Sequence, residues 1–161
     1  DAISQKFPQV MKKKIHEGLF EGSGDAKQVP LTNLHKLFNN LETITFGLVT
    51  NDSETNAIKH LEQHNLTQYF DMIIGYDSGY GSKPEPGQLE AFLRKTNLLS
   101  HEVLMIGDST YDLVAANKIS MPCLGVLSGT ANKKDLSPHT PFIIDSIDEL
   151  ETWLKKTFPI S

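Results

Sequence analysis

The chain lacks the features that mark several classes of protein. Its 161 residues include one cysteine, Cys123, which excludes an internal disulfide and fits a reducing compartment. No apolar run approaches the length of a transmembrane span, and no stretch has the pattern of a signal peptide. Acidic residues outnumber basic ones by 20 to 15, so nucleic acid and anionic membranes have no electrostatic reason to bind. We therefore expect a cytoplasmic protein whose partners are neither nucleic acid nor a membrane.

Short apolar runs alternate with helical patterns from about Val29 onward. This alternation is typical of an α/β fold with a parallel sheet. Strands are predicted at residues 44–49, 70–74, 103–106, 122–127 and 142–144. Helices are predicted at residues 54–64, 87–96, 109–118 and 147–156. The expected fold class is a doubly wound, mostly parallel, Rossmann-like sheet.

The first 28 residues have a different pattern. Apolar residues at Val10, Met11, Ile15 and Leu19 have helical spacing, and a Gly-rich loop follows them. Since no strand is predicted here, residues 1–28 are interpreted as the remnant of a helical appendage. Residues 29–161 are then the α/β core.

Thr50 and Asn51 directly follow the predicted strand that ends at Val49. A hydroxyl and backbone N–H groups at a strand-to-helix turn can bind a phosphate. The simpler alternative is that Asn51, Asp52 or Ser53 caps the next helix.

Lys83 lies in a loop, residues 79–86, that is rich in glycine and proline. These residues restrict the loop, so that its lysine can be directed inward, where an ammonium would neutralise the charge of a phosphate. The alternative is a solvent-exposed lysine. The glycine spacing matches no nucleotide-binding loop.

Asp108 and Asp112 follow the predicted strand at 103–106 and are four residues apart, which places them on one helical face. Paired carboxylates where a strand ends indicate Mg²⁺ and phosphate chemistry. Asp112 has an alternative role, because Ser109 and Asp112 fit a capping box. Asp108 has no such explanation, so we expect a metal or a lysine beside it.

Two further candidates are interpreted as structural. His60 and His64 are four residues apart but lack a third ligand, which favours a solvated helix face. Cys123 lies in an apolar strand and is assigned to the core.

Taken in order, Thr50, Lys83-Pro84 and the run Gly107 to Asp112 resemble three motifs of the haloacid dehalogenase-like (HAD) hydrolase superfamily. The sequence around these motifs is most similar to that of the small-capped phosphatases of the superfamily, especially those similar to phosphoglycolate phosphatase. The likeness covers about residues 29–150.

The resemblance implies roles for the residues at these positions. Thr50 would bind the transferring phosphate together with the backbone of Asn51, and Lys83 would stabilise the phosphate and the nucleophile. Asp108 would coordinate Mg²⁺, while Asp112 would orient the water shell of the metal or Lys83. Residues 1–28 would be the end of a helical cap.

The first motif of the family is absent. It is a strand ending in DxDx[TV], whose first Asp forms an aspartyl-phosphate and whose second acts as general acid and base. Five aspartates are considered for this motif, and none lies in such a pattern: Asp1, Asp25, Asp52, Asp71 and Asp77. The nucleophile is expected outside this chain.

In the family the missing strand is central. The resemblance therefore predicts the spatial order of the strands, named by one residue near each: Met72, Thr50, a vacant position, Asp108, Cys123 and Ile143. Omitting a strand would leave its neighbours about 10 Å apart with unpaired backbone groups. We therefore expect a missing N-terminal segment or a partner strand to complete the sheet.

The predicted function is a Mg²⁺-dependent phosphomonoester hydrolase for a small phosphorylated metabolite, inactive as this chain alone. The alternative is a catalytically inactive binding module or a truncated fragment. A phospho-accepting receiver domain fits less well, since its acidic pocket precedes its threonine and lysine, whereas here Thr50 and Lys83 precede Asp108.

Overall fold

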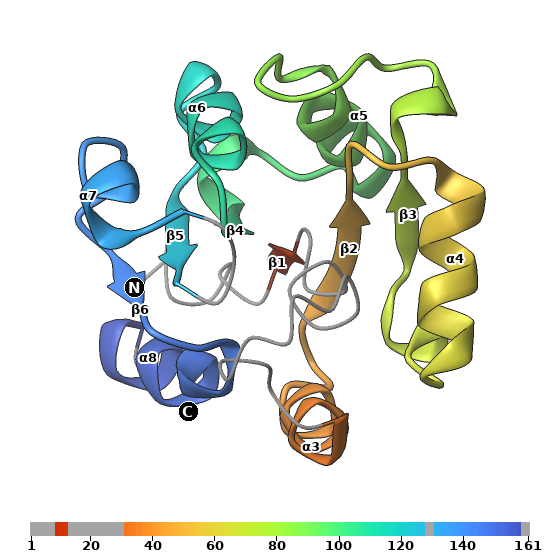
Figure 1. Cartoon of the computed structure of the whole chain (residues 1–161), viewed down its shortest axis with the longest axis horizontal. Helices are drawn as coiled ribbons and strands as arrows, with labels where there is room; N and C mark the ends of the chain where they lie inside the picture. The colour runs from red at the N-terminus through yellow and green to blue at the C-terminus, as the bar shows by residue number, and fades with distance from the viewer. Residues whose placement is uncertain (1–8, 13–30, 128–130, 159–161) are drawn as a thin grey trace.

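A computed structural model describes residues 9–12, 31–127 and 131–158. Its described strands form one parallel sheet in the order β3-β2-β1-β4-β5-β6 (Figure 1). The strands are β1 (Gln9–Lys12), β2 (Thr45–Val49), β3 (Met72–Ile74), β4 (Val103–Gly107), β5 (Cys123–Val126) and β6 (Ile143–Ile144). Strands β2, β4 and β5 are almost entirely buried, as expected of parallel strands covered on both faces.

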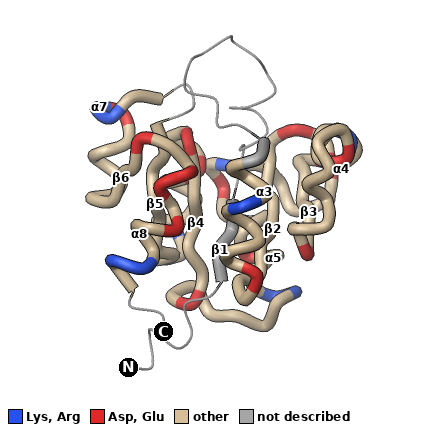
Figure 2. Tube along the Cα trace, turned by 90° about the horizontal axis from the view of Figure 1, so that it is seen from below, with Lys and Arg blue, Asp and Glu red and all other residues tan. Residues whose placement is uncertain are grey.

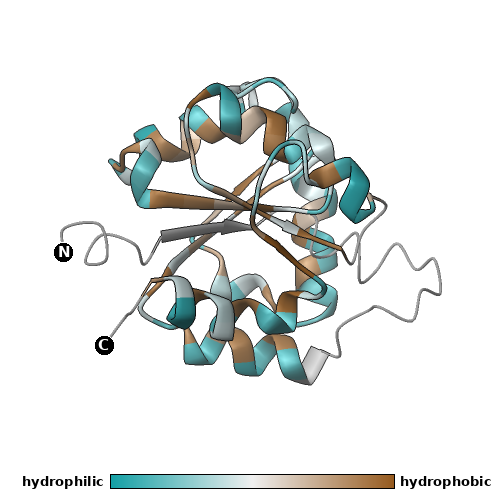
Figure 3. Cartoon of the chain, turned by 90° about the vertical axis from the view of Figure 1, so that its left-hand side faces the viewer, coloured by the Kyte–Doolittle hydropathy of each residue, from teal (hydrophilic) through white to brown (hydrophobic). Residues whose placement is uncertain are grey.

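Helices cover both faces of the sheet and turn their apolar residues toward it (Figure 3). The α-helices are α3 (Leu31–Asn40), α4 (Glu54–Gln63), α5 (Gly87–Thr96), α6 (Thr110–Lys118), α7 (Lys133–Leu136) and α8 (Leu150–Thr157). Short 3₁₀ helices lie at η1 (Thr67–Tyr69), η2 (Tyr76–Ser78), η3 (Ser100–Glu102) and η4 (Ile147–Glu149). One apolar core joins α3, α4 and α8 to the sheet, and the other joins α5, α6 and α7. The doubly wound α/β fold is confirmed.

The predicted order of five strands is also confirmed, but the central position is not vacant. Strand β1 pairs in parallel with β2 on one side and β4 on the other, with Lys12 opposite both Leu48 and Ile106. The prediction of an empty central position was therefore wrong. The physical reason is that a vacancy would leave two rows of unpaired backbone groups, and Gln9–Lys12 supplies their partners.

The N-terminal helix prediction was wrong for residues 9–12, which form a strand. The rest of the predicted cap remnant, at residues 1–8 and 13–28, lies outside the described residues, so the assignment of a cap stays a prediction. The other predicted strands and helices occur within a few residues of their expected bounds, except that 147–149 is a 3₁₀ turn before α8. None of the helices in the described part of the chain has the length and apolar character needed to cross a membrane.

Helix α5 lies directly on β2 because Gly47 has no side chain. The ring of Phe92 occupies that space, and a Cβ at Gly47 would lie 2.8 Å from Phe92 Cδ2. Phe92 is fully buried. This close contact fixes the middle of α5 on the middle of β2.

Acidic and basic positions are spread over several helices and loops along the chain (Figure 2). Basic positions lie on separate helices in that view, including α3, α7 and α8. That nucleic acid is not a partner stays a prediction.

Candidate functional site

Thr50 and Asp108 lie at one level of the sheet, on either side of β1. Lys12 of β1 pairs with Leu48 of β2 and with Ile106 of β4. Thr50 and Asp108 each come two residues after these paired positions. Since neighbouring strands lie about 4.8 Å apart, two intervals place these backbone positions about 10 Å from each other. Open α/β sheets bind ligands at this carboxyl edge.

Lys83 connects the two sides of this edge. Its Nζ donates a hydrogen bond of 2.7 Å to the carbonyl of Val49 at the end of β2. The same atom lies 3.4 Å from Oδ1 of Asp112 in the first turn of α6. Both side chains of this ion pair are fully buried. The prediction that Lys83 points inward is therefore confirmed by the geometry, and a solvent-exposed lysine is excluded.

Asp112 contacts both the start of α6 and Lys83. Its Oδ2 accepts hydrogen bonds from the backbone N–H and the hydroxyl of Ser109, at 3.2 and 3.1 Å, which caps α6. Its Oδ1 faces Lys83. Gly107 permits this arrangement, because a Cβ there would overlap the Asp112 side chain. The start of α6 thus holds the Asp112 carboxylate facing Lys83, and that Asp112 orients Lys83 for a reaction stays a prediction.

Asn51 holds the loop of Lys83 through its side chain. Its Nδ2 donates to the carbonyl of Lys83, and its Oδ1 accepts from the N–H of Lys83, each at 3.0 Å. The peptide bond between Lys83 and Pro84 is cis. The two hydrogen bonds of the Asn51 side chain join the loops that carry Thr50 and Lys83.

Thr50 continues the line of β2. Its N–H donates to the carbonyl of Ile74, and its hydroxyl oxygen accepts from the N–H of Asp52 at 3.0 Å. Ser53 is the residue that caps α4, since its hydroxyl accepts from the N–H of Asn56 at 3.1 Å. Of the three residues considered as the cap of α4, Ser53 is therefore the one whose side chain caps it.

Asp108 and Asp112 are the two residues predicted to bind a metal at this edge. Within the described residues, no three His, Cys, Asp or Glu side chains gather closely enough to form a metal site. Asp108 has 9% of its surface exposed, against 0% for Asp112, so Asp108 is the carboxylate nearer to solvent. This donor set fits an ion such as Mg²⁺, which keeps several waters and needs one or two carboxylates.

The two candidates interpreted as structural lie elsewhere. His60 and His64 are half-buried, so the expected solvated face is only partly correct. Partial burial, followed by the neighbouring His60, lowers the pKa of His64. Cys123 is buried as predicted, and burial raises the pKa of its thiol.

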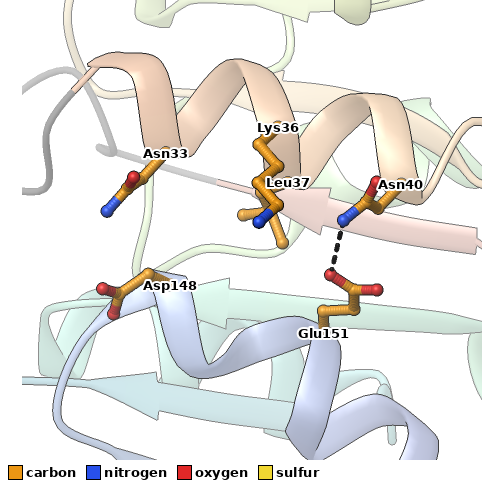
Figure 4. A pocket seen from close by; sticks show the side chains of 6 residues that line it. All are labelled: Asn33, Lys36, Leu37, Asn40, Asp148 and Glu151. Carbon is orange, nitrogen blue, oxygen red and sulfur yellow. Dashed lines mark hydrogen bonds between the residues drawn. The ribbon is translucent and has the colours of Figure 1, made fainter.

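A separate hollow of about 270 Å³ lies between α3 and α8, outside the edge that carries Lys83 (Figure 4). Its lining includes Lys36 and Leu37 of α3 and Glu151 of α8, and Asn40 donates a hydrogen bond of 3.0 Å to Glu151. Its charged side chains are half-buried or exposed. This hollow lies between helices, and none of the predicted site residues lines it.

The sequence pattern of haloacid dehalogenase-like hydrolases matches residues 2–126. The chain belongs to this family. It is 34% identical over 107 residues to a phosphoglycolate phosphatase from Vibrio parahaemolyticus, which covers 66% of this chain and 47% of that protein. The chain thus spans about half the length of the curated relatives it matches.

Solved structures of other HAD proteins have the same fold. A predicted phosphatase from Clostridium acetobutylicum is 26% identical with a TM-score of 0.70, covering 77% of this chain and 59% of its own. A haloacid dehalogenase-like family protein from Streptococcus pneumoniae has a TM-score of 0.74 and covers 93% of this chain and 99% of its own. At 15% identity the second likeness shows the fold alone.

Sequence reasoning missed Gln88, a buried residue that contacts the backbone of Thr50. It is fully buried in the first turn of α5, and its Nε2 donates to the carbonyl of Thr50 at 2.9 Å. The available signal was a polar residue on the apolar face of a helix, since Gln88 precedes the buried Ala91 and Phe92 by three and four positions.

Proposed function

We propose that this chain supplies the phosphate-binding and metal-binding part of a Mg²⁺-dependent phosphomonoester hydrolase. The substrate is a small phosphorylated metabolite of the phosphoglycolate type. The proposal includes an aspartyl-phosphate whose nucleophile lies outside this chain.

The observation that carries the proposal is the buried Lys83. Its ammonium is held between the Val49 carbonyl and the Asp112 carboxylate, at the edge of the sheet where Thr50 and Asp108 also lie. An orienting carboxylate and a backbone acceptor fix the position of the charge before a substrate binds. Such preorganised charge is effective at stabilising a transferring phosphoryl group.

The chain's own residues would bind and orient the phosphate. The hydroxyl of Thr50 and the backbone N–H of Asn51 would donate to its oxygens, and Lys83 would neutralise its charge. Asp108 would ligate Mg²⁺, and Asp112 would keep Lys83 in place. When bound, Mg²⁺ would supply further charge neutralisation at the phosphate.

The nucleophile must reach the central position of the sheet, since in the family the attacking carboxylate follows that strand. Strand β1 holds this position here, and its sequence Gln-Val-Met-Lys contains no carboxylate. We therefore propose that an N-terminal segment or a partner strand carrying DxDx[TV] takes the central position in the active protein.

Hydrolysis of p-nitrophenyl phosphate tests the proposal. The 161-residue chain alone should be inactive, and a protein in which a DxDx[TV] strand precedes it should release phosphate only with Mg²⁺. In that protein Asp108→Asn should reduce kcat by at least about 10²-fold, the size of the effect of removing one oxyanion-hole hydrogen-bond donor in other enzymes. Asp148→Asn, an exposed carboxylate at η4, is the matched control and should leave kcat unchanged.

Two results would contradict different parts of the proposal. Full activity of Asp108→Asn would refute its metal role. Turnover by the 161-residue chain, lost on Lys83→Met, would refute an external nucleophile.

A catalytically inactive HAD-like binding module is the second candidate. The observation that favours it is the same carboxylate-free β1 in the central position. A chain that binds inorganic phosphate, while the longer protein with the DxDx[TV] strand shows no turnover, would select this alternative.

A further inference from the structure

The side-chain amide of Gln88 is buried, and its two polar atoms have different surroundings. The side chain is fully buried, and Nε2 donates to the carbonyl of Thr50 at 2.9 Å. Oε1 is also buried and has no hydrogen-bond partner within the part of the chain that the structure describes. A buried acceptor without a partner destabilises a fold, which offsets the contribution of the hydrogen bond that Nε2 makes. Stability alone therefore does not explain a glutamine at this position.

The bond from Gln88 acts on the peptide that links Thr50 to Asn51. A peptide unit is planar and trans, so its carbonyl and its N–H point in opposite directions. Holding the Thr50 carbonyl toward the interior at Gln88 consequently turns the Asn51 N–H away from it. That N–H is the group that the proposed function assigns to the phosphate.

The same peptide is also held from its other end. The Asn51 side chain exchanges two hydrogen bonds of 3.0 Å with the backbone of Lys83. Helix α5, which carries Gln88, is in turn fixed on β2 by the contact of Phe92 with Gly47. The peptide is thus held by two elements that are themselves well packed, which is what a precise binding geometry requires.

We propose that Gln88 is a positioning residue that orients the Thr50–Asn51 peptide so that the Asn51 N–H faces a bound phosphate. This rests on the proposed function. It adds a residue outside the three motifs, one that acts on the phosphate through the backbone and does not touch it.

The test is a titration of the ¹⁵N-labelled 161-residue chain with inorganic phosphate in the presence of Mg²⁺, followed by the amide signal of Asn51. Gln88→Met removes the donor and keeps the length of the side chain. We expect it to weaken phosphate binding about tenfold, as loss of a hydrogen bond to a charged group does. We also expect it to abolish the shift of the Asn51 amide and to change the urea midpoint little, because the lost donor to the Thr50 carbonyl is offset by removal of the buried Oε1.

Thr96→Val is the matched control on the same helix. It removes a side-chain hydrogen bond of 2.8 Å to the carbonyl of Phe92, at the end of α5 away from Gln88. It should leave the phosphate affinity and the Asn51 shift as in the wild type. If Gln88→Met binds phosphate with wild-type affinity, or lowers only the urea midpoint, Gln88 is structural and the inference is wrong.

Gln88→Glu keeps the inference testable if Gln88→Met does not fold. A protonated carboxyl donates to the Thr50 carbonyl, but an ionised one does not, so the Asn51 amide of this variant should shift with pH without phosphate. A flat pH profile would overturn the inference. If the wild-type chain binds no phosphate, the proposed function fails, and the Asn51 amide of the unliganded variants still decides whether Gln88 sets the peptide orientation.

Discussion

Removing the Lys83 ammonium should destabilise the protein far more than removing an exposed lysine. In Lys83→Met, the Asp112 carboxylate stays buried and keeps its Ser109 hydrogen bonds but no longer has the Lys83 ammonium beside it. Breaking a buried ion pair on one side costs about 3–5 kcal/mol. A domain has a total stability of about 5–15 kcal/mol, so a large share of it would be lost.

The matched control is Lys118→Met. Lys118 pairs with Glu85 at 3.0 Å, a shorter distance than the 3.4 Å of the buried pair, but these side chains are 41% and 71% exposed. An exposed pair contributes at most about 1 kcal/mol. The comparison thus separates burial from distance, and we expect burial to decide.

Urea unfolding followed by the fluorescence of Trp153 measures both variants. Trp153 is the only tryptophan of the chain and packs between Phe142 and Phe158. A loss below about 1 kcal/mol in Lys83→Met, equal to that of Lys118→Met, would refute the buried pair. The double variant Lys83→Met/Asp112→Asn removes both charges, and its amide oxygen can still accept from Ser109, so it should recover part of the loss because no uncompensated charge stays buried.

Three further changes test single contacts. Gly107→Ala should destabilise the protein by about 1–3 kcal/mol in urea unfolding, because its methyl group would overlap Asp112. Native Cys123 should react with a thiol reagent at pH 8 much more slowly than the urea-unfolded chain, since burial raises the pKa of its thiol. The hydrogen bond from Lys155, followed by that from Asn40, lowers the pKa of Glu151. Glu151→Gln should therefore cost up to about 1 kcal/mol at pH 7 in urea unfolding. That difference from the wild type should disappear as the pH falls below the ordinary carboxyl pKa of 4.5 and through the lowered pKa of the folded state.

The sequence predicted the parts of the site whose signal is local. Thr50, Lys83 and Asp108 each follow a strand or lie in a restricted loop, and the structure brings their elements to one edge of the sheet. The sequence did not predict that the side chain of Asn51 binds the backbone of Lys83. A polar residue after a strand is most simply explained as a helix cap. Non-local hydrogen bonds of this kind leave no periodic pattern in a sequence.

Strand β1 was missed for a different reason. Val10 and Met11 are adjacent apolar residues flanked by Gln9 and Lys12, and together with Ile15 they fit a helical period better than an alternating one. A four-residue strand is too short for its own pattern to outweigh that of its neighbours. What determines its conformation is the pairing with β2 and β4, which no property of the segment itself reveals.

The position of β1 also separates the stability of the sheet from its chemistry. Backbone pairing on both sides needs only a strand, and the four residues of β1 provide it without a carboxylate. Phosphoryl transfer needs a nucleophile at the end of that same strand, beside Thr50 and Asp108. The sheet can therefore be continuous while the proposed reaction is incomplete. For the same reason, a segment that carries DxDx[TV] can complete the site only by taking the place of β1, and its binding should release Gln9–Lys12 from both ladders.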